Sequence, residues 1–185
     1  MLQIVIQGRG GQGAQTAGNL LAAAFFADGR QVQCFATYGG ARRGTPVSSF
    51  LRVDDRPIRL RCDIECADAI LCFDASLLDG PLMARAGAAT VIVVNSARTP
   101  ADFARSLPGR RVVPVNALAI SQRRGLGRIV NSALLGSLAR AVGAPSLEVL
   151  GATLTERSPK LHAQNLAACE DGWNQAGAWL RPEAA

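Results

Sequence analysis

Lysine, histidine and aromatic side chains are scarce in this sequence of 185 residues, although its formal net charge is +6. Lys160 is the single lysine among 20 basic residues, so nineteen are arginines, and aromatic residues make up only 5% of the chain. Proteins that bind nucleic acids usually carry a concentrated basic stripe with interleaved aromatic residues. The arginines here are scattered, so the charge predicts no nucleic-acid partner. Local anion sites remain open, because arginine binds phosphate or carboxylate oxygens in pairs.

Long apolar runs and metal-binding motifs are also absent. No apolar stretch approaches the ~18 residues of a membrane span, and the start, Met1-Leu2-Gln3-Ile4, lacks the features of a secretory signal. We therefore expect a cytoplasmic protein that contacts no membrane. The five cysteines form no C-x-x-C pair, and the single histidine, His162, has no matching cysteine partner. This pattern favours reduced thiols and predicts no metal site.

The sequence does contain an alternation of apolar strands and helical patterns. Its length and the absence of low-complexity linkers predict a single domain, residues 1–185. We predict strands at 2–7, 31–36, 47–53, 69–73, 90–94 and 111–115, and helices at 14–27, 131–142 and 160–180. This order predicts an α/β, Rossmann-like three-layer domain with a mostly parallel sheet. Residues 47–60 are expected to form an inserted, antiparallel β-hairpin that turns at Asp54-Asp55.

A glycine-rich loop follows the first predicted strand and precedes the first predicted helix. Its pattern is G-x-G-x-x-G, in which glycines permit a tight turn and the helix N-terminus favours an anion. The alternative is a structural turn in which strand and helix pack closely. The candidate anion-binding residues here are Gly8, Arg9, Gly10, Gly11, Gln12 and Gly13.

A second turn rich in glycine and arginine follows the second predicted strand. We expect it to lie near the first loop, and its arginines can supply bidentate phosphate contacts. An ordinary solvated surface turn is the alternative. Its candidate residues are Thr37, Tyr38, Gly39, Arg42, Arg43, Gly44 and Thr45.

No catalytic group accompanies these two loops. An NAD site expects an acidic residue at the end of the second strand, but the stretch found there, Phe35-Ala36-Thr37-Tyr38, contains none. The loop also lacks the Gly-Lys-Ser/Thr of a Walker A motif. Four acids occur between residues 63 and 74, of which Asp63, Glu65 and Asp68 are expected to cap or solvate a loop, and Asp74 is the fourth. We predict no catalytic residue in this chain.

Three blocks of the sequence, in order, resemble the gamma subunit of the 2-oxoacid:ferredoxin oxidoreductases. They are the glycine loop at 8–13, the stretch from Tyr38 to Val47, and the stretch from Gly127 to Gly136. The family includes pyruvate, 2-ketoisovalerate, indolepyruvate and phenylglyoxylate enzymes, and the similarity runs over nearly the whole chain. Where many relatives have Tyr-Gly-Pro-Glu, this chain has Tyr38-Gly39-Gly40-Ala41 and lacks the acid.

The resemblance implies a subunit of a complex that oxidatively decarboxylates a 2-oxoacid with coenzyme A (CoA) to acyl-CoA and carbon dioxide. Thiamine diphosphate with magnesium and the iron–sulfur clusters belong to other subunits: thiamine-binding alpha and beta subunits and a ferredoxin-like delta subunit. This chain alone is expected to be inactive, to hold no cofactor by itself, and to assist assembly and CoA binding through the two glycine-containing loops.

Three alternatives stay open. One is an aromatic 2-oxoacid version of the complex with NAD or ferredoxin as acceptor, in which an NAD-linked flavoprotein subunit is a further partner. Another is a stand-alone nucleotide-binding oxidoreductase of Rossmann type. A purely structural subunit, whose glycine loop fills an interface, is a third class.

Overall fold

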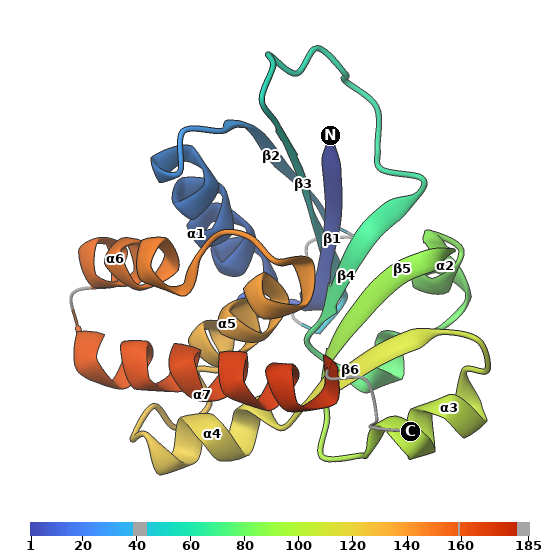
Figure 1. Ribbon diagram of the computed structural model, residues 1–185. Coiled ribbons are helices and arrows are strands. Elements are labelled where there is room, and N and C mark those ends of the chain that lie inside the picture. The colour runs from blue at the N-terminus through green and yellow to red at the C-terminus, as the bar shows by residue number, and fades with distance from the viewer. Residues whose placement is uncertain (39–43, 159, 181–185) are drawn as a thin grey trace.

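The computed structural model of the protein describes residues 1–38, 44–158 and 160–180. A six-stranded sheet with the order β2-β3-β1-β4-β5-β6 forms its middle layer (Figure 1). The neighbours β1, β4, β5 and β6 pair in parallel, whereas β3 pairs antiparallel with both β1 and β2. The strands are β1 (Leu2–Arg9), β2 (Gln31–Tyr38), β3 (Pro46–Asp54), β4 (Ala67–Cys72), β5 (Ala86–Asn95) and β6 (Arg111–Val115).

Helices cover the two faces of this sheet (Figure 1). One face carries α1 (Ala14–Ala27), α4 (Ala117–Arg123), α5 (Asn131–Val142), α6 (Leu147–Arg157) and α7 (His162–Leu180). The other carries the short elements η1 (Ala75–Leu77), α2 (Gly80–Met83) and α3 (Pro100–Ser106). An apolar cluster fills each interface, because successive side chains of a strand point to opposite faces. The predicted α/β three-layer fold with a mostly parallel sheet is confirmed.

The helix layer depends on a close approach of α5 and α7. A methyl group on Gly136 would lie 2.1 Å from the carbonyl oxygen of Cys169, and one on Gly172 would lie 1.9 Å from that of Ala133. Only glycine fits at these positions, so the two helix backbones touch. The side chains of Ser132 and Asn165, both buried, join the same helices through a hydrogen bond of 2.7 Å.

The predicted hairpin at 47–60 is wrong. Residues 58–60 form no strand; β3 instead pairs with β2 over its whole length, with Tyr38 opposite Val47 and Gln31 opposite Asp54. The hairpin is therefore β2–β3, and its second strand lies between β2 and β1. β3 is buried almost throughout and fits the interior of a sheet, whereas the segment after it contains Pro57 and exposed arginines. The helix predicted at 160–180 begins two residues later, at His162.

The direction in which the strands are connected fixes where a ligand site is expected. From β1 the chain passes through α1 to β2 on one side, and from β4 it continues to β5 and β6 on the other. The strand order therefore reverses between β1 and β4. In such sheets ligands bind beyond the carboxyl ends of the strands at this switch point.

Candidate functional site

The loop between β1 and α1 is a closed turn held by its own groups. The Gln12 side-chain oxygen accepts a hydrogen bond of 2.7 Å from the backbone N–H of Arg9, and the Gln12 N–H donates 2.9 Å to the Arg9 carbonyl. Gly11 and Gly13 have φ of +93° and +92°, in the left-handed region that favours glycine. Within the described part of the chain, the N–H groups of Gly11 and Gly13 have no hydrogen-bond acceptor. These two amides are free to bind an anion.

The second predicted turn meets the first loop through β3. The N–H of Gly10 donates a 2.9 Å hydrogen bond to the carbonyl of Thr45, and Gly8 lies opposite Val47 in the sheet. The expected proximity of the two loops is therefore confirmed for Gly44 and Thr45. Thr37 is exposed near the end of β2, and the backbone of Tyr38 belongs to that strand. The remaining predicted residues of this turn, Gly39, Arg42 and Arg43, lie outside the described residues.

The guanidinium group of Arg9 is already engaged. Its Nε donates 2.9 Å to Oδ2 of Asp74, one Nη donates 2.8 Å to the Ser76 hydroxyl, and the other lies 3.4 Å from the Gly44 carbonyl. Partial burial acts to raise the pKa of Asp74, but hydrogen bonds from Ser76 and Arg9 lower it further, so the net shift is downward. Asp74 is therefore ionised at neutral pH. Arg9 ties the glycine loop to the end of β4 and to the second turn.

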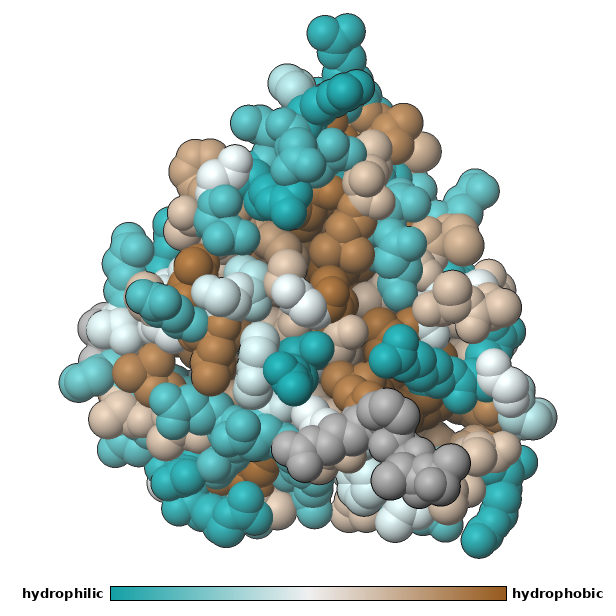
Figure 2. All heavy atoms as spheres, viewed as in Figure 1, coloured by the Kyte–Doolittle hydropathy of each residue, from teal (hydrophilic) through white to brown (hydrophobic). Residues whose placement is uncertain are grey.

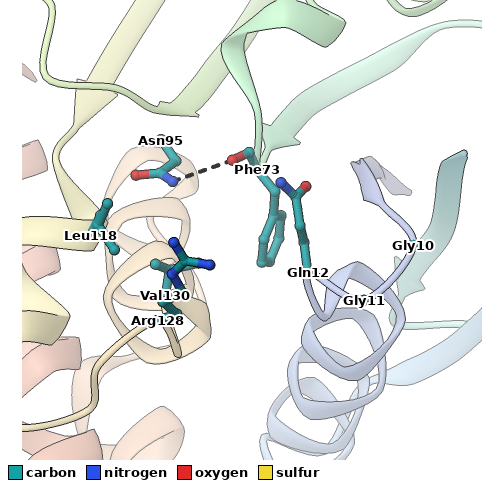
Figure 3. A pocket seen from close by; sticks show the side chains of 8 residues that line it. All are labelled: Gly10, Gly11, Gln12, Phe73, Asn95, Leu118, Arg128 and Val130. Carbon is teal, nitrogen blue, oxygen red and sulfur yellow. Dashed lines mark hydrogen bonds between the residues drawn. The ribbon is translucent and has the colours of Figure 1, made fainter. Parts of the chain in front are cut away.

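A pocket of about 420 Å³ opens at the switch point, beyond the carboxyl ends of β1, β4 and β5 (Figure 3). Figure 3 shows the glycine loop on one side and Arg128 on the other, with the Phe73 ring between them. Asn95 donates 3.3 Å to the Phe73 carbonyl and so fixes the end of β5 against the end of β4. The lining residues are Gly10, Gly11, Gln12, Phe73, Asn95, Leu118, Arg128 and Val130.

Arg128 supplies the positive charge of this pocket. It is exposed, and among the described residues it forms no ion pair and no hydrogen bond. No other described residue that lines the pocket carries a charge at neutral pH. The pocket thus combines one guanidinium group and the free amide of Gly11 with the apolar side chains of Phe73, Leu118 and Val130. This combination suits a ligand with an anionic part and an apolar part.

The start of α5 packs directly against the glycine loop. A methyl group on Gly13 would lie 2.8 Å from both terminal atoms of the Asn131 amide, closer than real side chains allow. The Asn131 Oδ1 atom is buried and has no hydrogen-bond partner among the described residues. This contact therefore couples the position of the glycine loop to that of α5. The residues just before α5 form part of the pocket wall.

The groups near the pocket do not form a nucleophile or a metal site. Burial raises the pKa of the Cys72 thiol to about 12, and this thiol donates 3.0 Å to the Asp74 carbonyl. It is therefore protonated at neutral pH and a poor nucleophile.

In the described ranges, no three His, Cys, Asp or Glu side chains come together as metal ligands. None of the helices described there combines the length and apolar character that crossing a bilayer requires.

Comparison with known proteins agrees with the fold. The sequence model of the pyruvate ferredoxin/flavodoxin oxidoreductase family matches residues 3–175. The chain belongs to this family. The resemblance to its gamma subunits, recognised from three sequence blocks, is confirmed.

Three of the similar proteins are single subunits of about the same length. The chain is 38% identical over 181 residues to the pyruvate/ketoisovalerate oxidoreductases common subunit gamma of Thermococcus kodakarensis, covering 95% of this chain and 97% of that one. It is 36% identical over 180 residues to the pyruvate synthase subunit PorC of Methanocaldococcus jannaschii, with the same coverage. The crystal structure of pyruvate oxidoreductase subunit PORC from Thermotoga maritima superposes with a TM-score of 0.81 at 28% identity, covering 94% and 95% of the two chains.

Arg128 lines the pocket and was not among the residues predicted from the sequence. The stretch from Gly127 to Gly136 carried the resemblance, but nothing in its spacing indicated that Arg128 faces the glycine loop. Of the predicted residues, Gly10, Gly11 and Gln12 line the pocket, whereas Arg9, Gly44 and Thr45 support it from outside.

Proposed function

We propose that this chain is the gamma-type subunit of a 2-oxoacid oxidoreductase complex and binds coenzyme A for it. The complex converts a 2-oxoacid and CoA into acyl-CoA and carbon dioxide, and two electrons pass to an acceptor such as ferredoxin. Family membership and relatives named as subunits of pyruvate and ketoisovalerate oxidoreductases support this assignment. The observation that carries the CoA role is the pocket in which Arg128 faces the free amides of the glycine loop.

The anionic part of CoA matches the polar side of this pocket. A phosphate between Arg128 and the loop would accept charge-assisted hydrogen bonds, each worth about 1.5–3 kcal/mol. The N–H of Gly11 and that of Gly13 at the start of α1 are available to it, and the helix dipole adds ~0.3–1 kcal/mol. The pantetheine part offers an apolar surface to Phe73 and Leu118. A pocket of about 420 Å³ lies within the range of ligand pockets, roughly 300–1,000 Å³.

The sequence hypothesis for the other arginines changes in one respect. Arg9 acts as a positioning residue, since its donors are used by Asp74, Ser76 and Gly44. Arg42 and Arg43 keep their proposed role as phosphate contacts, because the neighbouring Thr45 is bonded to Gly10 at the pocket. Gly8, Thr37, Tyr38 and Gly39 belong to the same proposed CoA site.

The chemical step belongs to the partner subunits in this proposal. Thiamine diphosphate with magnesium and iron–sulfur clusters reside in the alpha, beta and delta subunits. None of the described residues that line the pocket exchanges a proton near neutral pH, which suits a binding role. In this proposal the chain is inactive by itself, acts in the cytoplasm with its partners, and contributes CoA binding and assembly.

The deciding experiment measures CoA kinetics in the assembled complex with the variant Arg128→Gln. Loss of a charge-assisted contact should raise the KM for CoA by roughly 10–100-fold with little change in kcat, because 1.4 kcal/mol corresponds to a factor of ten. The double variant Arg42→Ala and Arg43→Ala should also raise this KM. Arg111→Gln, which removes an exposed arginine at the start of β6, is the matched control and should leave the KM unchanged.

Three results would overturn the assignment. An unchanged KM for CoA in Arg128→Gln, with the complex intact, removes the proposed contact. Saturable quenching or enhancement of NAD(P)H fluorescence by the isolated chain would favour the stand-alone nucleotide-binding oxidoreductase. If the complex assembles but CoA does not protect the glycine loop from proteolysis, the purely structural subunit would be favoured.

A further inference from the structure

The connection between β3 and β4 lies at the end of the sheet where the parallel strands begin, opposite the end that carries the glycine loop. The end of β3 lies there because Val53 pairs with Leu2 at the start of β1, whereas the glycine loop follows the end of β1. Figure 1 shows this connection extending well beyond the sheet, and Figure 2 shows hydrophilic side chains gathered at the same protruding end. We call residues 56–61 the basic arm. Its sequence, Arg56-Pro57-Ile58-Arg59-Leu60-Arg61, contains three arginines and no acid.

Two arginines of the main body hold the base of the basic arm. Arg52 donates 2.8 Å to the carbonyl of Cys62 and 3.0 Å to that of Asp63, and Arg85 donates to the carbonyl of Ile64. Arg52 is only 1% exposed, and its remaining bonds go to two glutamine side chains and to the Cys62 sulfur. A buried charge is costly unless it is hydrogen-bonded. Arg52 is therefore fully satisfied only while these carbonyls stay in place, which fixes the root of the arm.

The arm itself is anchored near both of its ends. The backbone N–H of Arg56 donates 3.1 Å to Oδ1 of Asp54, and the side-chain amide of Gln33 in β2 donates 2.7 Å to the carbonyl of Leu60. The Leu60 side chain remains 43% exposed. Arg56, Arg59 and Arg61 are all exposed around it. The arm thus presents an apolar side chain among guanidinium groups on an anchored backbone.

The charges of the basic arm have no acidic partner within the described residues. The two acids that precede it are already used, because Asp54 pairs with the N-terminal amine at 3.2 Å and Asp55 pairs with Arg30. Arg61 bonds only to the neighbouring Leu60 carbonyl. The arm therefore carries three positive charges that the described fold does not neutralise.

We propose that the basic arm is a docking surface for an acidic face of another protein subunit. This rests on the proposed function only in that the chain works within a complex. Guanidinium groups around an exposed Leu60 match the composition of protein interfaces, where arginine is enriched and charge complementarity selects the partner. The arm contains no aromatic residue on which a nucleotide base could stack. Because the arm and the proposed CoA pocket lie at opposite ends of the strands, CoA and the acidic subunit can bind without competing.

The test compares assembly of the complex with a variant that neutralises the arm. The chain is co-expressed with the subunits encoded beside it. Its dissociation constant from the complex is then measured at NaCl concentrations between about 50 and 400 mM, because salt in this range increasingly screens exposed charges. The arm variant carries Arg56→Gln, Arg59→Gln and Arg61→Gln. Losing three ion pairs should raise the dissociation constant about tenfold at low salt and flatten its salt dependence.

A matched variant removes the same net charge elsewhere. It carries Arg105→Gln, Arg111→Gln and Arg157→Gln, three exposed arginines on α3, β6 and α6. Its dissociation constant should stay within about twofold of that of the unchanged protein, since these exposed charges contribute little individually. A second measurement needs no variant. Phenylglyoxal should modify the arm arginines in the free chain, and the assembled complex should protect them but not the three control arginines.

The results separate this proposal from the CoA assignment. Unchanged assembly and salt dependence of the arm variant, or equal modification of the arm in free and assembled chain, would overturn the docking surface. So would binding of duplex DNA or anionic vesicles that the arm variant loses while assembly stays intact. The KM for CoA of the arm variant, measured at protein concentrations that saturate assembly, should be unchanged. An effect of Arg128→Gln on that KM would therefore survive failure of the docking surface.

Discussion

Replacing Gly13 with alanine tests how the glycine loop and α5 are held together. Alanine at this position must adopt the left-handed conformation, at φ +92°, which costs an L-residue about 1–2 kcal/mol. Its methyl group would also lie 2.8 Å from the Asn131 amide, and relieving that overlap costs roughly a further 1–2 kcal/mol. We expect Gly13→Ala to lower the free energy of unfolding by about 2–4 kcal/mol.

The variant Asn131→Ala separates the two contributions. Its own effect should be within about 1 kcal/mol, because the lost packing is offset by removal of a buried oxygen that has no partner. In the Asn131→Ala background, Gly13→Ala should cost only the backbone contribution of about 1–2 kcal/mol.

The measurement is urea unfolding of four proteins: the unchanged protein, Gly13→Ala, Asn131→Ala and the double variant. The free energy of unfolding of each is obtained by linear extrapolation. If Gly13→Ala costs the same in both backgrounds, the contact between Gly13 and Asn131 does not hold the loop, and the reasoning fails.

Three further predictions concern packing, pH and thiol reactivity. Gly172→Ala should destabilise the protein by about 3 kcal/mol or more in the same urea assay, because its methyl group would lie 1.9 Å from a carbonyl oxygen. The control Gly151→Ala should change stability by less than about 1 kcal/mol, because its methyl group would meet only the flexible end of a leucine side chain, at 3.2 Å. Because the pKa of Asp74 is lowered in the folded state, its stabilisation is present above the ordinary carboxyl value of 3.8 and is lost as pH falls below it. The free energy of unfolding of Asp74→Asn, measured from pH 6 to pH 3, should therefore fall less steeply than that of the unchanged protein; equal slopes would contradict this. Iodoacetamide at pH 8, followed by mass spectrometry, should label the exposed Cys62 and spare Cys72, which is buried with a pKa of about 12; rapid labelling of Cys72 in the folded protein would show that it is not shielded.

The main features of the fold were predictable because they depend on local patterns. The bounds of α1 and α5 matched the prediction, since a glycine in the left-handed region lies before α1 and after α5. The place of β3 was not predictable. An apolar strand with one antiparallel neighbour and one with two look alike in sequence, and only packing decides whether a strand enters the middle of the sheet.

The candidate site divides in the same way. Convergence of the two loops was predicted from the position of each after a strand, but the contact between Gly10 and Thr45 arises through β3, which the sequence reasoning had assigned to a separate hairpin. The amino-acid sequence by itself determined the glycine loop, the helix behind it and the family, because these depend on residue types at short spacing. Only the tertiary structure decided that Arg9 is paired and that Arg128 faces the pocket. Arg9 lies 65 residues from Asp74 and is neutralised by it, whereas Arg128 has no such partner among the described residues. Ion pairing across such separations depends on how the chain folds.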